Sequence, residues 1–591
     1  MQIPQNFKIQ ILNNKQDFKN QYPKPFQLKS NNDIISFSAR RTNKKIDERM
    51  TEYAIKLLNE NKFQEGQPLY IKGNSYYLPF METLSKEAYK MNSGHVHIEV
   101  IEPQLEKLKE KFNKKEQFEY QKQRLKEFKD ANALFIEFTE TNDPYKKAGV
   151  FKKEVLEEIA KTSTSIPQKI RSLFKLNPKE ILIDALDMKK GQPAVIFAER
   201  EHLPFIKKIV NFLYSKNKTD LVDINITNNN NKNEMMYGSD KLFETMPEHK
   251  VKQVKEYYDQ DVAWLRLYGR DPAMYEDVPA EKIARSQKFN SSNDEFNEYS
   301  AKAQADVPWL VYNLPTVLSA IPAYPELADD KLQLIAKAYE DASKINRTGE
   351  LKEHIDALEY RAKKINELIQ NGYRTFHYVS VNKDTNLPDG KTDFTVKVSP
   401  KSVFKSARTE MPKYKHSIIC NIPTEEVFTA PQADTANGTL SATMPLSLSG
   451  KIIEGIKLTF KDGQVVDVKA DKNEDILQNF IKENENANRL GELALVAGSP
   501  IGKAGRIFNS TLLDENASCH FALGNAYTDT VIGAEDIADY KEQKKYLQNN
   551  KINVSPIHTD FMVGGVNVIV TAINDKTGDT IEVLKEDKFL L

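Results

Sequence analysis

The feature that most constrains this fold is a repeat of about 120 residues in the N-terminal part of the chain. The segment GQPLYIKG at Gly66 returns as GQPAVIFA at Gly191. Matching positions stay 125 residues apart over 24 residues, and they are Gly66 and Gly191, Leu78 and Leu203, Pro79 and Pro204, and Tyr89 and Tyr214. A period of this length is far above that of a solenoid, so it predicts two domain-sized units.

Each copy alternates helical and strand patterns. In the first copy a helical stretch from Ile46 to about Asn61 precedes the segment at Gly66, and a second helix precedes VHIEVIE at Val96. This order predicts Rossmann-like α/β units with parallel sheets. Neither copy contains a GxGxxG or GxxxxGK[ST] loop, so we interpret GQP as a turn before a buried strand rather than a phosphate site.

After Tyr373 short runs alternate apolar and polar residues between Gly, Pro and Asn-Gly, which predicts a β-rich domain. The expected regions are an N-terminal extension (1–45), a first α/β unit (46–165), a second α/β unit with a helical hairpin from Pro325 to Tyr373 (166–374), and the β-rich domain (375–591). We expect a linker over Lys146 to Pro178. We also expect surface loops at the asparagine run 228–231 and at the insertion DYKEQKKYLQNN.

The amino-acid composition limits the kinds of molecule that we expect this protein to bind. The 591 residues include 84 Lys and Arg and 84 Asp and Glu, so net charge gives no argument for nucleic acid or a membrane surface. No run approaches the roughly 18 apolar residues of a spanning helix, and Cys420 and Cys519 are too few for a disulfide framework. We expect a soluble, cytoplasmic protein that acts on a small or neutral molecule.

Two motifs of the β-rich domain place acids beside apolar runs. In NIPTEEVFTAP, Glu425 and Glu426 would point to opposite faces of an extended backbone, so one could bind a metal while the other reaches a water. An exposed acidic turn is the alternative, and for this motif alone it is favoured. Glu492 opens the apolar run GELALV, so it either lies at the mouth of a strand or has a cation as partner.

Two further motifs carry histidines. His520 in LLDENASCHFALGNAY has apolar neighbours, which by itself favours a core histidine over a ligand. Cys519 beside it would point away, so a cysteine nucleophile is disfavoured. His558 and Asp560 in HTDFMVGG are two positions apart and would share one face of a strand, as ligands of one metal or as a hydrogen-bonded pair.

Taken together and in this order, the four motifs resemble the signature blocks of the aminopeptidase T and aminopeptidase S family of metallopeptidases. The resemblance covers about residues 170 to 591, so residues 46 to about 165 are an extra copy of the family's first domain. It implies an α/β domain followed by a β-rich catalytic domain, a homodimer, peptide substrates and two divalent metal ions (Zn, Co or Mg). The implied metal-site residues are Glu426, Glu492, His520, Tyr527, His558 and Asp560.

The expected reaction is removal of N-terminal residues from peptides. Two close divalent ions would lower the pKa of a water shared between them, so that hydroxide forms near neutral pH. Glu425 would take the proton of that water, and Tyr527 would stabilise the oxyanion. The alternatives are a non-catalytic protein that binds a small ligand on its Rossmann-like units, and a metal-dependent hydrolase of another amide.

Overall fold

The computed structural model describes residues 44–114, 116–150, 172, 174, 176–290, 292–448, 451–537 and 539–591. Residues 42–591 form one compact unit by their contacts, and the described helices and strands all belong to it. Almost all of the predicted extension (1–45) and most of the predicted linker (146–178) lie outside the described residues.

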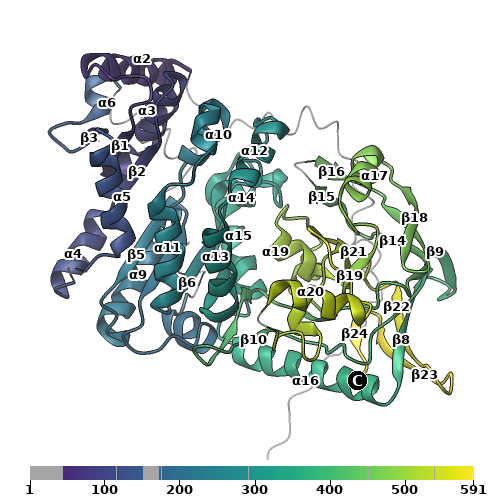
Figure 1. Ribbon diagram of the computed structural model, residues 1–591. Helices are drawn as coiled ribbons and strands as arrows, with labels where there is room; N and C mark the ends of the chain where they lie inside the picture. Colours follow the sequence, from purple (N-terminus) through teal and green to yellow (C-terminus); the bar gives the residue numbers. More distant parts are fainter. Residues whose placement is uncertain are drawn as a thin grey trace, which may run out of the picture. The chain divides into compact units, whose positions relative to one another are not determined.

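The first α/β unit has a parallel sheet of three described strands in the order β2-β1-β3. Its elements are α2 (Lys44–Glu60), β1 (Leu69–Asn74), α3 (Leu78–Lys90), β2 (Val96–Ile101), α4 (Pro103–Lys111), α5 (Glu119–Asp130), β3 (Leu134–Glu137) and α6 (Pro144–Lys147) (Figure 1). Leu69 and Ile71 of the central strand are fully buried, as expected of a strand covered on both faces.

The second α/β unit repeats this order and extends it. Among the described residues its parallel sheet has the order β12-β7-β6-β4-β5, in which β5-β4-β6 corresponds to β2-β1-β3. Its elements are η3 (Glu180–Ala185), β4 (Ala194–Ala198), α9 (Leu203–Phe212), β5 (Val222–Ile226), α10 (Asn230–Tyr237), α11 (Glu248–Asp259), β6 (Ala263–Tyr268), α12 (Ala280–Asn290), α13 (Asp294–Asp306), β7 (Trp309–Asn313), α14 (Val317–Ala320) and β12 (Asn421–Ile422). The predicted helical hairpin is present as α15 (Lys331–Ile345) and α16 (Leu351–Gln370).

The two α/β units pack through α3 with α10, α4 with α9, and α5 with α11. The Glu256 carboxylate accepts hydrogen bonds from the backbone N–H groups of Glu119 and Tyr120, both at 2.9 Å, at the start of α5. The prediction of a surface loop at residues 228–231 is wrong. Asn229 donates through its backbone and side-chain nitrogens to the Glu82 carboxylate at 2.8 and 3.0 Å, so this polar run joins the two units.

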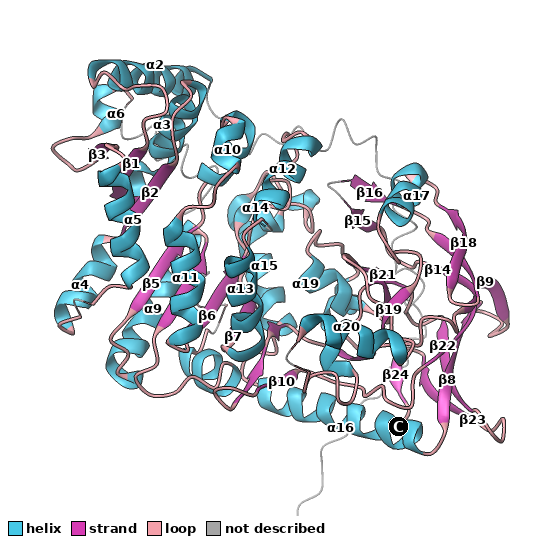
Figure 2. Cartoon of the chain, viewed as in Figure 1, coloured by secondary structure: helices cyan, strands magenta, loops and turns pink. Residues whose placement is uncertain are grey.

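The β-rich part contains two antiparallel sheets. The described strands of the larger sheet are β18 (Gln464–Lys469), β17 (Lys457–Lys461), β14 (Asn437–Ser441), β9 (Pro388–Lys397), β8 (Tyr373–Val381), β22 (Val568–Asn574), β23 (Thr580–Lys585) and β24 (Lys588–Phe589), in spatial order. The smaller sheet has the order β13 (Glu426–Thr429), β19 (Leu490–Val496), β20 (His520–Gly524) and β21 (His558–Met562). Figure 2 shows these strands in magenta beside the mainly helical remainder.

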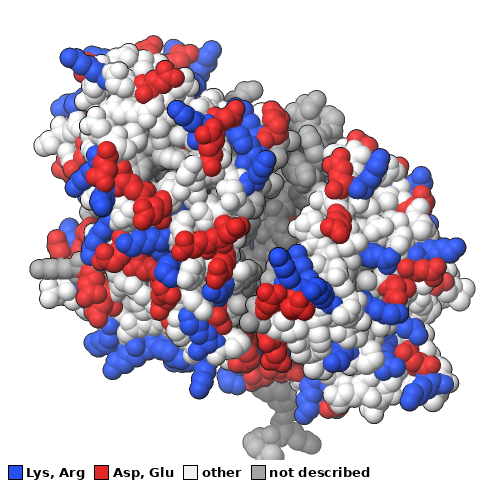
Figure 3. All heavy atoms as spheres, in the orientation of Figure 1, with Lys and Arg blue, Asp and Glu red and all other residues white. Residues whose placement is uncertain are grey.

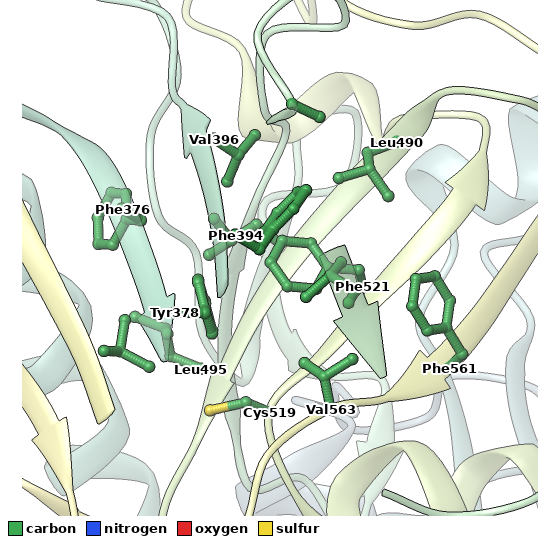
Figure 4. Close-up of a cluster of buried hydrophobic side chains, with 14 of the residues drawn as sticks. Phe376, Tyr378, Phe394, Val396, Leu490, Leu495, Cys519, Phe521, Phe561 and Val563 are labelled. Carbon is green, nitrogen blue, oxygen red and sulfur yellow. The ribbon is translucent and has the colours of Figure 1, made fainter. Parts of the chain in front are cut away.

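An aromatic core joins the two antiparallel sheets. Phe521 of the smaller sheet lies with its ring centroid 5.0 Å from Tyr378 and 5.3 Å from Phe394, both in the larger sheet (Figure 4). All three side chains are fully buried. This packing fixes one face of the smaller sheet against the larger one.

One short segment connects the parallel sheet to the smaller antiparallel sheet. Strand β12 pairs with β7, and β13 begins at Glu426, four residues after β12 ends at Ile422. Glu426 is therefore tied through the backbone to the second α/β unit.

Smaller elements complete the C-terminal half. They are the hairpin of β10 (Arg408–Met411) and β11 (His416–Ile419), the pair β15 (Leu446–Leu448) and β16 (Lys451–Ile453), and helices α17 (Glu474–Glu483), α18 (Pro500–Ala504), α19 (Thr511–Asp514) and α20 (Tyr540–Asn549). The insertion predicted as a surface loop is helix α20. Asp539 caps its N-terminus, and Leu547 is buried in a small core, which is why the segment is helical.

The surface agrees with the balanced charge. Figure 3 shows acidic and basic side chains interspersed over the face in view. Within the described ranges we find no helix with both the length and the apolar character needed to cross a bilayer.

Candidate metal centre

The smaller antiparallel sheet brings the predicted ligands onto one face. Glu492 lies opposite Ala522, which lies opposite Asp560, while His520 lies opposite Ala494. Because side chains alternate along a strand, these positions share a face with Glu426, which lies opposite Val496. The intervening side chains face the aromatic core, and they are Val427, Leu493, Leu495, Phe521 and Phe561.

The ligand atoms converge into two groups. Glu426, Glu492 and His520 form one group, and Glu492, His558 and Asp560 form the other, with ligand atoms in each group within 4.8 Å of one another. Nε2 of His520 is 3.0 Å from Oε2 of Glu426. Nε2 of His558 is 3.0 Å from Oε2 of Glu492 and 3.3 Å from Oδ1 of Asp560. Glu492 belongs to both groups and so lies between them.

Backbone carbonyls orient both imidazole rings. Nδ1 of His520 donates to the carbonyl of Ser518 at 3.1 Å, and Nδ1 of His558 donates to the carbonyl of Asn525 at 2.8 Å. Each ring therefore presents Nε2 to the carboxylates, as metal-binding histidines usually do. A glycine is needed at 491, since a Cβ there would lie 2.2 Å from the Asn525 carbonyl oxygen.

The electrostatics of the cluster favour cations. Burial lowers the pKa of His520, but the Glu426 carboxylate 3.0 Å away and the surrounding carboxylates outweigh burial and raise this pKa to about 10. Burial also lowers the pKa of His558, whereas Asp560 and Glu492 together raise it to about 11. Burial raises the pKa of Glu492 to about 7, with a further contribution from the charges of Asp560 and Glu426.

Two buried carboxylate oxygens of the cluster have no hydrogen-bond partner within the described part of the chain. They are Oε2 of Glu426 and Oδ1 of Asp560, which lie 3.0 and 3.3 Å from Nε2 of His520 and of His558 without the alignment of a hydrogen bond. A buried acceptor without a donor is costly, and a divalent cation would satisfy both oxygens. Carboxylate oxygens and imidazole nitrogens also suit a divalent metal, so these residues fit the predicted ions.

Tyr527 lies at the edge of the cluster. Its ring centroid is 4.7 Å from that of His558, and 48% of the residue is exposed. The pKa of its phenol is raised by burial of the hydroxyl and then by the charges of Glu492 and Asp560. The phenol therefore keeps its proton and can donate a hydrogen bond to a ligand at the centre.

Glu425 is not brought into the cluster. Its carboxylate lies toward the helical hairpin, where Oε1 accepts from Nε of Arg347 and Oε2 from Nη2, both at 3.2 Å. Glu425 and Glu426 face opposite sides, as predicted. The Glu425 carboxylate contacts the guanidinium of Arg347, whereas the prediction was that it would contact a water. The general-base role predicted for Glu425 stays a prediction, and its carboxylate is bonded to Arg347.

Glu515 is the acid that the sequence reasoning missed. It lies in the turn η8 (Glu515–Ala517), and its pKa is raised well above the ordinary value by burial and then by the charges of Asp560 and Glu426. The carboxyl is thus within electrostatic reach of the whole cluster. A turn has no side-chain periodicity, so the only signal was an acid five residues before His520 in the same motif.

Cys519 lies on the core side of β20. It is 1% exposed, and burial raises the pKa of its thiol to about 12. A protonated thiol inside the aromatic core is not a nucleophile, as the sequence analysis predicted for Cys519.

Buried carboxylates and paired histidines on one face of a sheet are the ligand set of a metalloenzyme. Comparison with known proteins identifies which kind. The family model described as "Thermophilic metalloprotease (M29)" matches residues 46–175 and 180–589. The chain belongs to this family.

Curated relatives of the chain are named aminopeptidases. Aminopeptidase AmpS of Bacillus subtilis is 30% identical over 396 residues, which are 66% of this chain and 91% of that protein. Aminopeptidase T of Thermus thermophilus is 27% identical over 412 residues, covering 68% of this chain and 95% of that protein. A solved structure, wild-type AmpT from Thermus thermophilus, has a TM-score of 0.62 at 23% identity, and the likeness covers 72% of this chain and 99% of that one.

These matches confirm the predicted family and the predicted metal-dependent aminopeptidase. They also confirm a mixed fold with parallel α/β and β-rich sheets. The relatives account for about two thirds of the chain, while the family model additionally matches residues 46–175.

Proposed function

We propose that this aminopeptidase removes the N-terminal residue of peptides at two divalent ions held by Glu426, Glu492, His520, His558 and Asp560. The supporting observation is that the two ligand groups share Glu492, so its carboxylate could serve both ions. Zn, Co and Mg all accept such oxygen and nitrogen donors, so the identity of the ions stays open to metal analysis.

When bound, the ions would activate water and polarise the scissile carbonyl. The protein supplies the remaining functions. Tyr527, half exposed beside His558, would donate a hydrogen bond to the carbonyl oxygen as negative charge develops there. The free α-amine of the peptide would occupy the centre, which restricts cleavage to the first peptide bond.

We assign the transfer of the proton to Glu515 in place of Glu425. The pKa of Glu515 is raised by burial of its carboxyl and by the charges of Asp560 and Glu426, and its Oε1 lies 3.4 Å from Nδ2 of Asn516, whereas Arg347 occupies both oxygens of Glu425. General acid–base groups contribute about 10²- to 10⁴-fold to a rate. Glu515→Gln should therefore lower kcat by about that factor while the protein stays folded, and an unchanged kcat would remove Glu515 from this role.

The function itself is tested by release of amino acids from aminoacyl-nitroanilides, with and without added Co²⁺ or Zn²⁺. Metal-loaded protein should cleave free-amine substrates and leave N-acetylated ones intact. Cleavage of both would favour a hydrolase of another amide. Absence of cleavage, together with unchanged bound metal in Glu492→Ala, would favour a non-catalytic ligand-binding protein.

We also propose that residues 46–165 and 166–374 contain two copies of one Rossmann-like unit, ahead of a catalytic domain at 375–591. The corresponding strand orders β2-β1-β3 and β5-β4-β6 support this. The reciprocal packing supports it too, because α3 corresponds to α9 and α4 to α10, so that exchanging the copies maps one helix contact onto the other.

A cytoplasmic homodimer remains the expected state. The first α/β unit already covers α9, α10 and α11 of the second, so a dimer would use another surface. Mass in solution, measured with and without metal, tests this.

A further inference from the structure

We propose that Arg347, acting through Glu425 and Asn516, is a positioning residue for the metal centre. This inference rests on the proposed function, since it concerns how the ligands of that centre are held. Arg347 lies between α15 and α16, in the second α/β unit, and contacts the chain directly beside a ligand.

The first step is the ion pair. Glu425 is 1% exposed, and its two oxygens accept separate hydrogen bonds from one guanidinium. Two parallel bonds fix both the distance and the plane of the carboxylate, which a single charged contact does not. His354 adds to this side: its Nε2 donates to the Thr424 carbonyl at 2.7 Å and is 3.6 Å from Oε1 of Glu425.

The second step is the geometry at the start of β13, whose first residue, Glu426, directly follows Glu425. Adjacent side chains of an extended strand point to opposite faces, so an orientation imposed on Glu425 also sets the direction of Glu426. Oε2 of Glu426 must lie near His520, from which it is separated by 3.0 Å. Clamping Glu425 on the far side therefore aims Glu426 into the cluster.

The third step is the contact of Asn516 with both Glu425 and Glu515. The buried side chain of Asn516 accepts from the backbone N–H of Glu425 at 2.8 Å and donates to the Leu512 carbonyl at 3.1 Å. The same amide nitrogen lies 3.4 Å from Oε1 of Glu515 as a donor. One amide thus connects the segment clamped by Arg347 with the carboxyl that we assign to proton transfer.

These contacts make a continuous path from the helical hairpin to two groups of the centre, although Arg347 itself touches neither. Loss of residues that support metal ligands typically costs 10- to 100-fold in metal affinity or activity. Arg347→Met should therefore weaken metal retention and lower kcat/KM by about 10- to 100-fold. Arg347→Lys, which keeps the charge but loses the paired bonds, should give a smaller loss of both.

The test measures metal affinity, kcat and KM separately, and the melting temperature of the metal-free protein, in the full chain. Arg374→Met is the matched control. Arg374 pairs with Asp575 at 3.3 Å, its side chain is 26% exposed against 29% for Arg347, and it lies on β8 of the larger sheet. The control should lower the melting temperature without changing metal affinity or kcat.

A purely structural ion pair predicts a different result. In that case both Arg347 variants would melt earlier but retain wild-type metal affinity and kcat in the folded fraction, and the positioning role would be wrong. If Arg347→Met does not fold, Arg347→Lys decides the question by the same two readouts. Wild-type cleavage of free-amine substrates in the same assay keeps the aminopeptidase assignment separate from this outcome.

Discussion

The two α/β units share a central arrangement of strands but differ in the strands added to it. In the first unit the described sheet ends at β3, whereas the second adds β7 and β12, and β12 leads directly into the strand of Glu426. Among the described residues, the second unit is therefore joined to the segment of Glu426 by the backbone, and Arg347 contacts that segment at Glu425. Similar units can serve different purposes because function depends on what the strands connect to.

The largest effect is expected in the smaller antiparallel sheet, which carries the ligand groups, and not in either α/β unit. Glu492→Gln removes the carboxylate that the two ligand groups share, so metal content should fall and activity should drop by at least about 10³-fold. Metal analysis and nitroanilide cleavage measure this. Glu542→Gln, on exposed α20, is the control and should change neither.

The next largest effect tests the connection between the second α/β unit and the metal centre. Asn313 lies at the end of β7, and its Nδ2 donates to Oδ1 of the buried Asn346, beside Arg347, at 3.2 Å. Nδ2 of Asn346 donates to the backbone carbonyl of Asn313 at 2.7 Å. Asn313→Ala removes the donor to Oδ1 of Asn346 and keeps the bond to the backbone carbonyl at position 313, so it leaves one buried acceptor unpaired, at a cost of about 1 to 3 kcal/mol in the free energy of unfolding. The loosened junction should also lower kcat/KM by about 3- to 10-fold if the path from Arg347 through Glu425 transmits position.

Acid sensitivity should depend in part on a buried histidine of the second unit. His202 corresponds to Tyr77 at the same 125-residue offset. Burial lowers the pKa of His202 to about 3, against about 6.5 in an unfolded chain. Between these pH values the unfolded chain binds a proton that the folded chain does not, so the free energy of unfolding falls as pH drops from about 6.5 toward 3.

His202→Gln should flatten that dependence in urea titrations across the same range. His377→Gln, at a surface pair with Asp393, should leave the slope as in the wild type. A variant at 202 with an unchanged slope would assign the acid sensitivity to other groups.

The smallest effect on activity is expected at the contact between the units. The Tyr120 hydroxyl donates to the Asp223 carboxylate and lies 3.1 Å from the Tyr257 hydroxyl. Tyr120→Phe removes these bonds and should cost about 1 to 3 kcal/mol in the free energy of unfolding, with kcat unchanged. A fall in kcat would show that the first unit is connected to the centre after all.

Local sequence patterns predicted much of this molecule. The offset of 125 residues predicted related α/β units, and the two-residue spacing of His558 and Asp560 predicted that they share a face. Both expectations depend on the period of one element, which a sequence displays directly. The helix α20 was missed because its charged and asparagine-rich composition concealed the single apolar side that packs on Val531 and Ile552.

The motifs around Glu426, Glu492, His520 and His558 predicted most of the residues that the smaller sheet brings together. Only the tertiary structure decided how neighbouring acids divide their roles. Glu425 pairs with Arg347, 78 positions earlier in the chain, and Glu515, in a turn, has its pKa raised by burial and by the charges of the cluster. Whether a carboxylate meets a guanidinium or a metal site depends on which distant segment packs against its face, and no local periodicity records that contact.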